Sequence, residues 1–140
     1  MSLKSIAALL FAKHATRQIN KWASTPVQTQ ERVFKQLISA AKNTAFGKDH
    51  EFNTISCHRE FIKKVPIRDY EALRPYVDRV VAGEKDILWP GKPLYFAKTS
   101  GTTSGAKYIP LTKESMPTHI KAARNAILCY INQTKKAAFV

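Results

Sequence analysis

The sequence predicts an α/β fold that, over these 140 residues, is of the α+β kind: mainly helical, with a short β-hairpin around a glycine-rich loop. Apolar residues recur at helical spacing along most of the chain, between residues that begin or stop helices. One strand-like run, residues 94–97, precedes the glycine-rich segment 98–107, and a second, Tyr108-Ile109, follows it. Since no internal repeat or low-complexity linker divides the chain, residues 1–140 are expected to form a single unit.

Two helices are expected before residue 44. The first lays one apolar face on a core, formed by Leu3, Ile6, Ala7 and Leu10. The second begins where Thr25 can act as N-cap and Pro26 as first-turn proline, with Gln28 as capping-box partner, and it ends near Asn43. Its apolar face consists of Phe34, Leu37, Ile38 and Ala41. Residues 44–53, which contain Gly47, are expected to form a loop.

Two further helices are expected between residues 56 and 83. Ser56 can cap a short helix whose buried side carries Phe61 and Ile62, and Pro66 stops it. Asp69 begins a helical region that runs to Ala82, with Gly83 as its C-terminal stop. Because proline removes a backbone donor, Pro75 is expected to break or restart that helix.

The last part of the chain combines the hairpin with a final helix. Residues 89–93 form a turn into the first strand, and Pro110 is expected to end the second strand. Thr112 or Ser115 can cap the last helix. The apolar stripe of that helix is Ile120, Ala123, Ile127 and Ile131, which we interpret as core packing.

The segment 98–107 has the chemistry to wrap an anion. It reads Lys-Thr-Ser-Gly-Thr-Thr-Ser-Gly-Ala-Lys, so hydroxyl side chains, two glycines and two lysines fall within ten residues. Glycines allow several backbone N–H groups to converge on one point, and such a concavity binds phosphate. The hydroxyls can donate to phosphate oxygens or help to hold Mg²⁺, and Lys107 can supply a mobile positive charge. We interpret the segment as a nucleotide phosphate loop.

The segment is neither of the two common nucleotide motifs. A P-loop requires G-x-x-x-x-G-K-[ST], whereas Gly101 and Gly105 are three residues apart and Lys107 is followed by Tyr108. The G-x-G-x-x-G pattern of dinucleotide-binding folds is also missing. The alternative reading is a polar surface loop, since Gly, Ser and Thr mark loops generally.

The order Thr-Ser-Gly-Thr-Thr-Ser-Gly-x-Lys resembles the phosphate loop of acyl-adenylate-forming enzymes, and most closely that of the auxin-responsive, Gretchen Hagen type acyl-acid amido synthetases and their bacterial relatives. Ser104 stands where the broader superfamily has Gly and Ala106 where it has Pro, which favours this branch. Further pieces occur in family order between about residues 30 and 115: Phe46-Gly47-Lys48, Val65-Pro66, Tyr70-Glu71, residues 74–79, Gly83-Glu84 and Lys107-Tyr108-Ile109-Pro110.

The resemblance implies the N-terminal part of the large domain of an ATP-dependent ligase. Such an enzyme adenylates a small carboxylic acid and transfers the acyl group to the amine of an amino acid, with ATP and Mg²⁺ as cofactors. By carry-over onto matching positions, Ser100, Gly101, Thr102 and Thr103 contact the phosphates. Thr99 flanks them, Ser104 and Gly105 complete the loop, and Lys107 is the catalytic residue that neutralises developing charge.

The family's proteins run to several hundred residues, so a chain of 140 is expected to be an N-terminal piece of a larger adenylating domain. The rest of that domain and the small C-terminal domain would be missing, and the piece alone is expected to be inactive. An apolar face left uncovered would favour self-association of the piece.

Composition excludes several other classes. The chain carries 23 Lys and Arg against 10 Asp and Glu, but the charge is spread evenly and no basic-aromatic RNA-binding motif accompanies it, so nucleic-acid binding is not expected. Cys57 and Cys129 match no metal spacing and suit a reducing, cytoplasmic compartment. The four histidines match no zinc pattern, so no protein metal site is expected. No apolar run approaches the length that crosses a bilayer.

One functional alternative stays open from the sequence alone. With a formal net charge of +13, the chain could be a small basic helical module that binds an anion or nucleic acid without catalysis.

Overall fold

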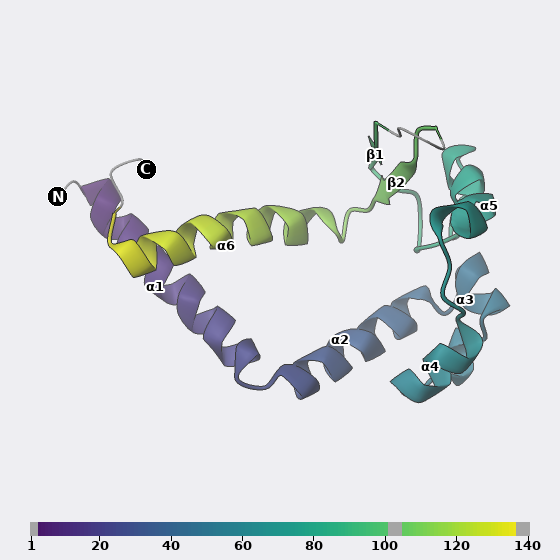
Figure 1. Ribbon diagram of the computed structural model, residues 1–140, viewed down its shortest axis with the longest axis horizontal. Helices are drawn as coiled ribbons and strands as arrows, with labels where there is room; N and C mark the ends of the chain where they lie inside the picture. The colour runs from purple at the N-terminus through teal and green to yellow at the C-terminus, as the bar shows by residue number, and fades with distance from the viewer. Residues whose placement is uncertain (1–2, 101–104, 137–140) are drawn as a thin grey trace. The chain divides into compact units, whose positions relative to one another are not determined.

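The computed structural model describes residues 3–100 and 105–136 (Figure 1). Its internal contacts divide the chain into two units, residues 1–29 with 114–140 and residues 30–113. The described residues are mainly helical, with one two-stranded antiparallel sheet, which agrees with the fold class expected from the sequence. That residues 1–140 form a single unit stays a prediction.

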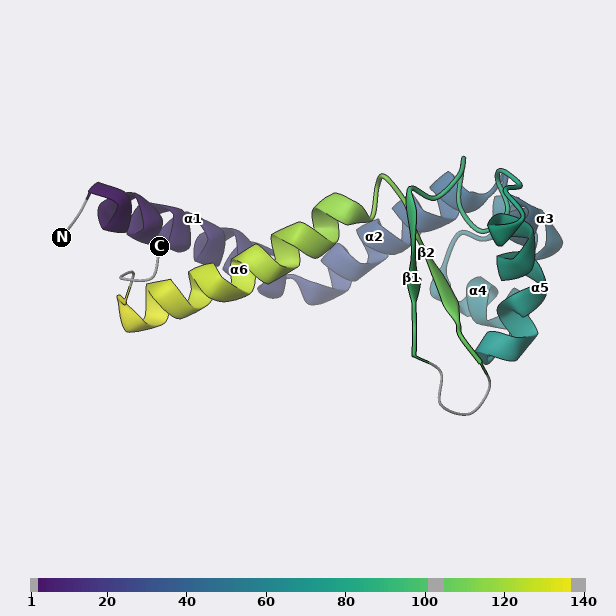
Figure 2. The ribbon, with the colours of Figure 1, turned by 90° about the horizontal axis from the view of Figure 1, so that it is seen from above.

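In the first unit, α1 (Leu3–Ala23) and α6 (Met116–Thr134) pack side by side (Figures 1 and 2). Ala8 and Ala12 of α1 are buried against Ile131 of α6. Small side chains on α1 let the two helix backbones approach closely, so the contact is formed by alanines rather than by large apolar residues. Leu9 and Leu128 pack at its border.

The apolar faces expected on these two helices are wrong. Leu3 is 83% exposed and Leu10 is 65% exposed, because α1 turns its alanine stripe toward α6 instead. Of the stripe expected on α6, only Ile131 is buried, whereas Ile120 and Ile127 are more than half exposed. The spacing correctly predicted two helices, but which face of each helix is buried depends on the partner against which it packs.

Helix α2 (Pro26–Ala41) begins at the expected proline, and the N–H of Thr29 donates to the carbonyl of Thr25 at 3.0 Å. Its buried face carries Ile38 and Ala41, as expected. Leu37 was expected on the same face but is 51% exposed.

The core of the second unit forms where the end of α2 meets the following turns. Ile38 and Ala41 cluster with Phe52 and Ile55. Around them pack partly buried apolar residues: Phe34, Phe46, Phe61, Val65 and Trp89. The rings meet edge to face, as Phe46 and Phe52 do with centroids 5.9 Å apart, which is a favoured geometry for aromatic pairs.

The loop expected over residues 44–53 is wrong. The structure forms α3 (Ala45–Asp49) and the 3₁₀ turn η1 (Phe52–Thr54) there. Thr44 is the N-cap of α3, and its Oγ1 accepts the N–H of Gly47 at 3.0 Å. The N–H groups of Ala45 and Phe46 donate to backbone carbonyls of residues 86 and 87, at 2.7 and 3.0 Å. The first turn of this short helix is therefore satisfied partly by a distant segment, which no local pattern reveals.

Gly47 allows α3 to pack directly on the end of α2. A Cβ at this position would lie 2.1 Å from the carbonyl oxygen of Ala41, a distance that no side chain tolerates. Thr44 bridges the same two elements, because its Oγ1 also donates to that carbonyl at 2.7 Å. Thr44 is 1% exposed, so both of its hydrogen bonds are shielded from water.

Helix α4 (His58–Lys64) begins one residue later than the expected cap implies. Cys57 occupies the N-cap position, while the N–H and the hydroxyl of Ser56 donate to the carboxylate of Glu60 at 2.6 and 2.9 Å. Phe61 packs on the core as expected, whereas Ile62 is 57% exposed.

Helix α5 (Tyr70–Val81) starts at the expected cap, with Asp69 Oδ1 accepting the N–H of Ala72 at 2.8 Å. Pro75 lies inside the helix and does not break it, contrary to expectation. Buried Val77 and Val80 follow the proline, and their packing holds the last turns in place. Gly83 stops the helix, as expected, at φ +89°.

Strands β1 (Tyr95–Lys98) and β2 (Tyr108–Leu111) form the antiparallel hairpin (Figure 2). Pro110 lies within β2, opposite Phe96, and does not end it. Since Thr99 is hydrogen-bonded to Lys107, alternation along the ladder makes the Phe96–Pro110 pair a non-hydrogen-bonded one. The missing N–H of Pro110 therefore removes no bond between the strands.

No helix within residues 3–100 and 105–136 is long and apolar enough to cross a membrane.

Replacing Gly47 by alanine is expected to lower the free energy of unfolding by about 2 to 4 kcal/mol, because the new Cβ forces α3 away from α2. Urea titration measures the change. The neighbouring variant Lys48→Ala, at an exposed position of the same helix, is the control and is expected to stay within about 0.5 kcal/mol. An unchanged urea midpoint for Gly47→Ala would contradict the close approach.

Replacing Thr44 by valine keeps the shape of the side chain but leaves the buried N–H of Gly47 without its acceptor. We expect a loss of about 1 to 3 kcal/mol in urea unfolding. Thr44→Ser retains the hydroxyl and is expected to lose only about 1 kcal/mol for the missing methyl group. Equal stability of the two variants would show that the hydroxyl is not the stabilising group.

Candidate functional site

The expected phosphate segment connects β1 to β2. The structure describes its two ends, residues 98–100 and 105–107. Gly101, Thr102 and Thr103, expected to contact phosphate, and Ser104, expected to complete the loop, lie outside the described residues. The described part of the site consists of the ends of the segment and the elements that hold them.

Thr99 and Lys107 join the two ends of the segment. The N–H of Thr99 donates to the carbonyl of Lys107 at 3.0 Å, and the N–H of Lys107 donates to Thr99 Oγ1 at 3.3 Å. These bonds extend the strand ladder by one pair beyond Lys98 and Tyr108. The hydroxyl of Thr99 is used as an acceptor, so its own hydrogen stays available for an oxygen ligand.

Gly105 has a backbone conformation that favours glycine, with φ +80°. A Cβ placed there would meet no heavy atom within 4 Å, so the backbone conformation rather than lack of space accounts for the glycine. Gly105, Ala106 and Ser100 are all exposed, so this part of the segment lies at the surface.

Two lysines flank the segment, each over an aromatic ring. Lys98 Nζ lies 5.9 Å from the centroid of the Tyr108 ring, and Lys107 Nζ lies 5.3 Å from the centroid of the Tyr70 ring. In the part of the chain that the structure describes, no carboxylate forms an ion pair with either lysine. A ring attracts a cation without supplying a counter-charge, so these contacts restrain the two side chains without forming ion pairs.

Tyr70 is a member of the site that the sequence did not indicate. It was noted only as part of a family-like dipeptide, yet its hydroxyl accepts the N–H of Tyr108 at 2.9 Å. The two residues are 38 positions apart, and no periodicity or spacing connects them. Only the packing of α5 beside β2 brings them together.

The donor set matches an anion with several oxygens. Lysine ammonium groups, hydroxyls and accessible N–H groups of a glycine-containing turn are the groups that bind phosphate in proteins. Among residues 3–100 and 105–136, no three His, Cys, Asp or Glu side chains lie close enough to hold a metal ion. The described part of the site can thus bind phosphate oxygens and neutralise negative charge.

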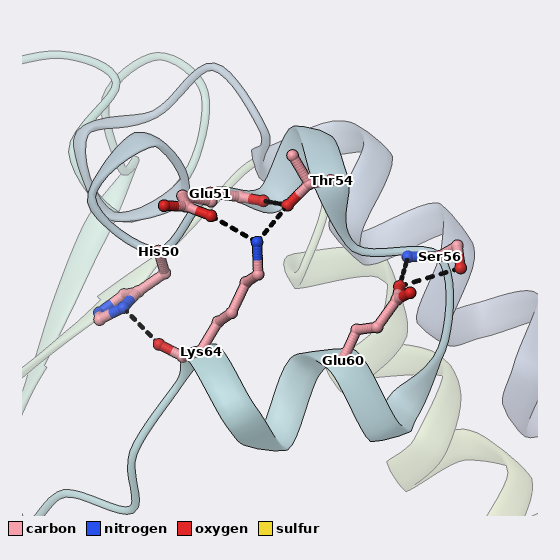
Figure 3. A network of polar contacts seen from close by, with 6 residues as sticks. All are labelled: His50, Glu51, Thr54, Ser56, Glu60 and Lys64. Atoms are coloured by element: carbon pink, nitrogen blue, oxygen red, sulfur yellow. Dashed lines mark hydrogen bonds and ion pairs between the residues drawn. The ribbon is translucent and has the colours of Figure 1, made fainter.

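A second polar cluster lies around the start and end of α4 (Figure 3). Lys64 Nζ contacts the carboxylate of Glu51 and the hydroxyl of Thr54, and the Lys64 carbonyl is 2.9 Å from His50 Nδ1. The hydrogen bond from Lys64 lowers the pKa of Glu51, and the N–H of Ser56 lowers the pKa of Glu60. Lys64 pairs with Glu51, and Glu60 is hydrogen-bonded by Ser56, so these contacts join α4 to the turn at η1 and are interpreted as structural.

Tyr76 of α5 makes a similar structural link. Its hydroxyl donates to Asp49 Oδ2 at 2.7 Å, which joins α5 to the end of α3. Burial, followed by the hydrogen bond to Asp49, raises the pKa of Tyr76.

A wide apolar groove of about 910 Å³ runs between α1 and α6. Its floor carries Phe11, Leu128 and Ile131, and cationic side chains such as Lys4 and Arg124 stand at its border. The buried Oδ1 of Asn125, which also lines it, has no hydrogen-bond partner among the described residues.

Comparison with known proteins identifies relatives. The chain is 28% identical over 117 residues to the indole-3-acetic acid-amido synthetase GH3.2 of Arabidopsis thaliana, which covers 82% of this chain and 20% of the relative. It is 33% identical over 95 residues to the indole-3-acetic acid-amido synthetase GH3.15 of the same plant, a match that covers 66% of this chain and 16% of the relative. It is 31% identical over 93 residues to the 4-substituted benzoates-glutamate ligase GH3.12 of the same plant, a match that covers 65% of this chain and 16% of the relative.

The chain spans only 16% to 20% of the length of these curated relatives. A family model described as the GH3 family N-terminal domain matches residues 15–139. The match includes the hairpin, the segment between its strands and the core around Gly47. The resemblance expected from the sequence is thereby confirmed, and the chain belongs to the GH3 family.

Proposed function

We propose that this chain is the N-terminal portion of an ATP-dependent acyl-acid amido synthetase and that its segment 98–107 binds the phosphates of ATP. Family membership supports the reaction class, because the relatives are named as amido synthetases and an acid–glutamate ligase. The main support for the assignment of the segment is the geometry at its ends, where Thr99 and Lys107 are hydrogen-bonded to each other. Beside them lie two ammonium groups that form no ion pair with a carboxylate among the described residues.

The proposed reaction has two steps. The carboxylate oxygen of the acid attacks the α-phosphorus of ATP, the bond to the bridging oxygen breaks, and pyrophosphate leaves with that electron pair. The amine of an amino acid then attacks the acyl carbon, AMP leaves, and the amine loses a proton. Small acids and amino acids are the substrate classes that the relatives' names suggest.

In this proposal the residues of the segment act on the phosphates. Ser100, Gly101, Thr102 and Thr103 contact phosphate oxygens, with Thr99, Ser104 and Gly105 shaping the loop around them. Lys107 neutralises the negative charge that grows as pyrophosphate leaves. A positive charge that is already positioned lowers the barrier, since it needs no reorganisation during the reaction.

The remaining parts of the proposal concern cofactor and setting. Mg²⁺ would be held through the phosphate oxygens, with the hydroxyls of the segment as the available protein ligands. A cytoplasmic location stays a prediction from the cysteine content.

Replacing Lys107 by alanine in the complete enzyme is expected to reduce acid-dependent ATP–pyrophosphate exchange roughly 100-fold or more, because the departing pyrophosphate loses its counter-charge. Exchange of labelled pyrophosphate into ATP measures the first step alone. Lys113→Ala, at an exposed position just after β2, removes the same charge and serves as the control with near-normal exchange. Normal exchange in Lys107→Ala would remove Lys107 from the mechanism.

The alternative of a basic anion-binding module without catalysis is favoured by one observation, the formal charge of +13. The two proposals differ in their dependence on salt and ligand. A module held by charge alone should lose affinity steeply between low and physiological salt and should bind ATP no better than other polyanions. We expect instead that ATP protects the complete enzyme against thermal unfolding more than inorganic triphosphate at equal concentration does. Equal protection by both would favour the module.

A further inference from the structure

Tyr70 lies at the start of α5, where its backbone is held firmly. Asp69 caps the helix through its bond to the N–H of Ala72, and α5 packs beside β2. Tyr70 is half-buried between this helix and the hairpin. It is the only described aromatic residue for which the structure records contacts with two successive positions at the end of the phosphate segment.

The first contact is made by the Tyr70 hydroxyl, which accepts the N–H of Tyr108. Because Thr99 pairs with Lys107, alternation along the ladder turns the N–H of Tyr108 away from β1. That N–H would otherwise be a free donor on the outer edge of β2. The next outward-facing position is Pro110, which has no N–H. Within residues 108–111, the N–H of Tyr108 is thus the one N–H group that points away from β1, and Tyr70 holds the strand there.

The second contact is made by the Tyr70 ring, which faces the ammonium group of Lys107. An acidic partner would also hold this side chain but would cancel its charge. The ring holds the ammonium group and leaves the charge available for another anion. Hydroxyl and ring act on adjacent residues, so one tyrosine restrains both the backbone and the side chain at the end of the segment.

We propose that Tyr70 is a positioning residue that holds Lys107 in place for the phosphates of ATP. The inference rests on the proposed function, since it assigns to Tyr70 a role that is exerted through Lys107. Tyr70 itself touches no phosphate in this proposal. Its hydroxyl sets the path of β2, and its ring limits the positions open to the ammonium group.

The test is a double-mutant cycle in the complete enzyme, read out as kcat/KM for ATP in acid-dependent pyrophosphate exchange. The variants are Tyr70→Leu, Lys107→Ala and the pair together. Tyr70→Leu is expected to lower kcat/KM roughly threefold to tenfold while Lys107 is present, the range for loss of a cation–π contact and a hydrogen bond. In the Lys107→Ala background the same change is expected to have almost no further effect, because the group that Tyr70 positions is gone.

Two further variants separate positioning from general stability. Tyr70→Phe keeps the ring and removes only the hydroxyl, so it is expected to lose less than Tyr70→Leu and to fold normally. Tyr95→Leu replaces a tyrosine that is 63% exposed on β1 and is the matched control, with unchanged kcat/KM. Thermal unfolding is recorded for every variant. If Tyr70→Leu fails to fold, the cycle is run with Tyr70→Phe, which retains the shape of the side chain.

The outcomes distinguish the two proposals. In one outcome, Lys107→Ala impairs exchange and the double variant loses kcat/KM by the product of the two single losses. Tyr70 then acts independently of Lys107, so the inference is overturned while the proposed function stands. If Lys107→Ala leaves exchange intact, the role of Lys107 fails and the inference fails with it. A loss from Tyr70→Leu that disappears in the Lys107→Ala background supports both.

Discussion

The close approach of Gly47 to the end of α2 is the constraint on which the second unit depends. It seats α3 on the Ala41 carbonyl and, with Thr44, completes a shielded junction between two helices. From α3, two N–H groups reach the carbonyls of Asp86 and Ile87, which lie on the path from α5 to β1. Because Gly47 has no side chain, α3 can lie against the end of α2. The position of α3 in turn determines the path of the segment that enters the hairpin. A larger residue at position 47 would displace the helix and these distant bonds together.

The hairpin that follows this segment positions the candidate site. Register between the strands, the mutual bonds of Thr99 and Lys107, and the contact from Tyr70 hold the two ends of the segment 98–107. The lysines at these ends lie over aromatic rings, and no carboxylate of residues 3–100 and 105–136 forms an ion pair with them. A phosphate site needs lysines that are held in place but not paired with a carboxylate, because such an ion pair would compete with the ligand.

Errors in the sequence-based expectations have a common cause. The expected helices were found, but the N-cap of α4 is Cys57 rather than Ser56, and α3 lies where a loop was expected. The buried face was misjudged on α1, where alanines pack and Leu10 is exposed. Pro75 and Pro110 were expected to end their elements, yet packing by Val77 and the non-hydrogen-bonded position opposite Phe96 accommodate them. In each case a long-range partner outweighed a local rule.

The sequence by itself determined the family and the hairpin, because both follow from residues that lie close together along the chain. That the segment between the strands binds phosphate remains a proposal drawn from its glycines, hydroxyls and lysines. The sequence also placed the start of α2 at Pro26 and the cap of α5 at Asp69, which depend on a few neighbouring residues. The tertiary structure alone decided that residues 45–49 form a helix and that Tyr70 contacts Tyr108 and Lys107. Those features depend on groups about 40 residues apart in the chain, and no local pattern records which distant groups will meet once the core has packed.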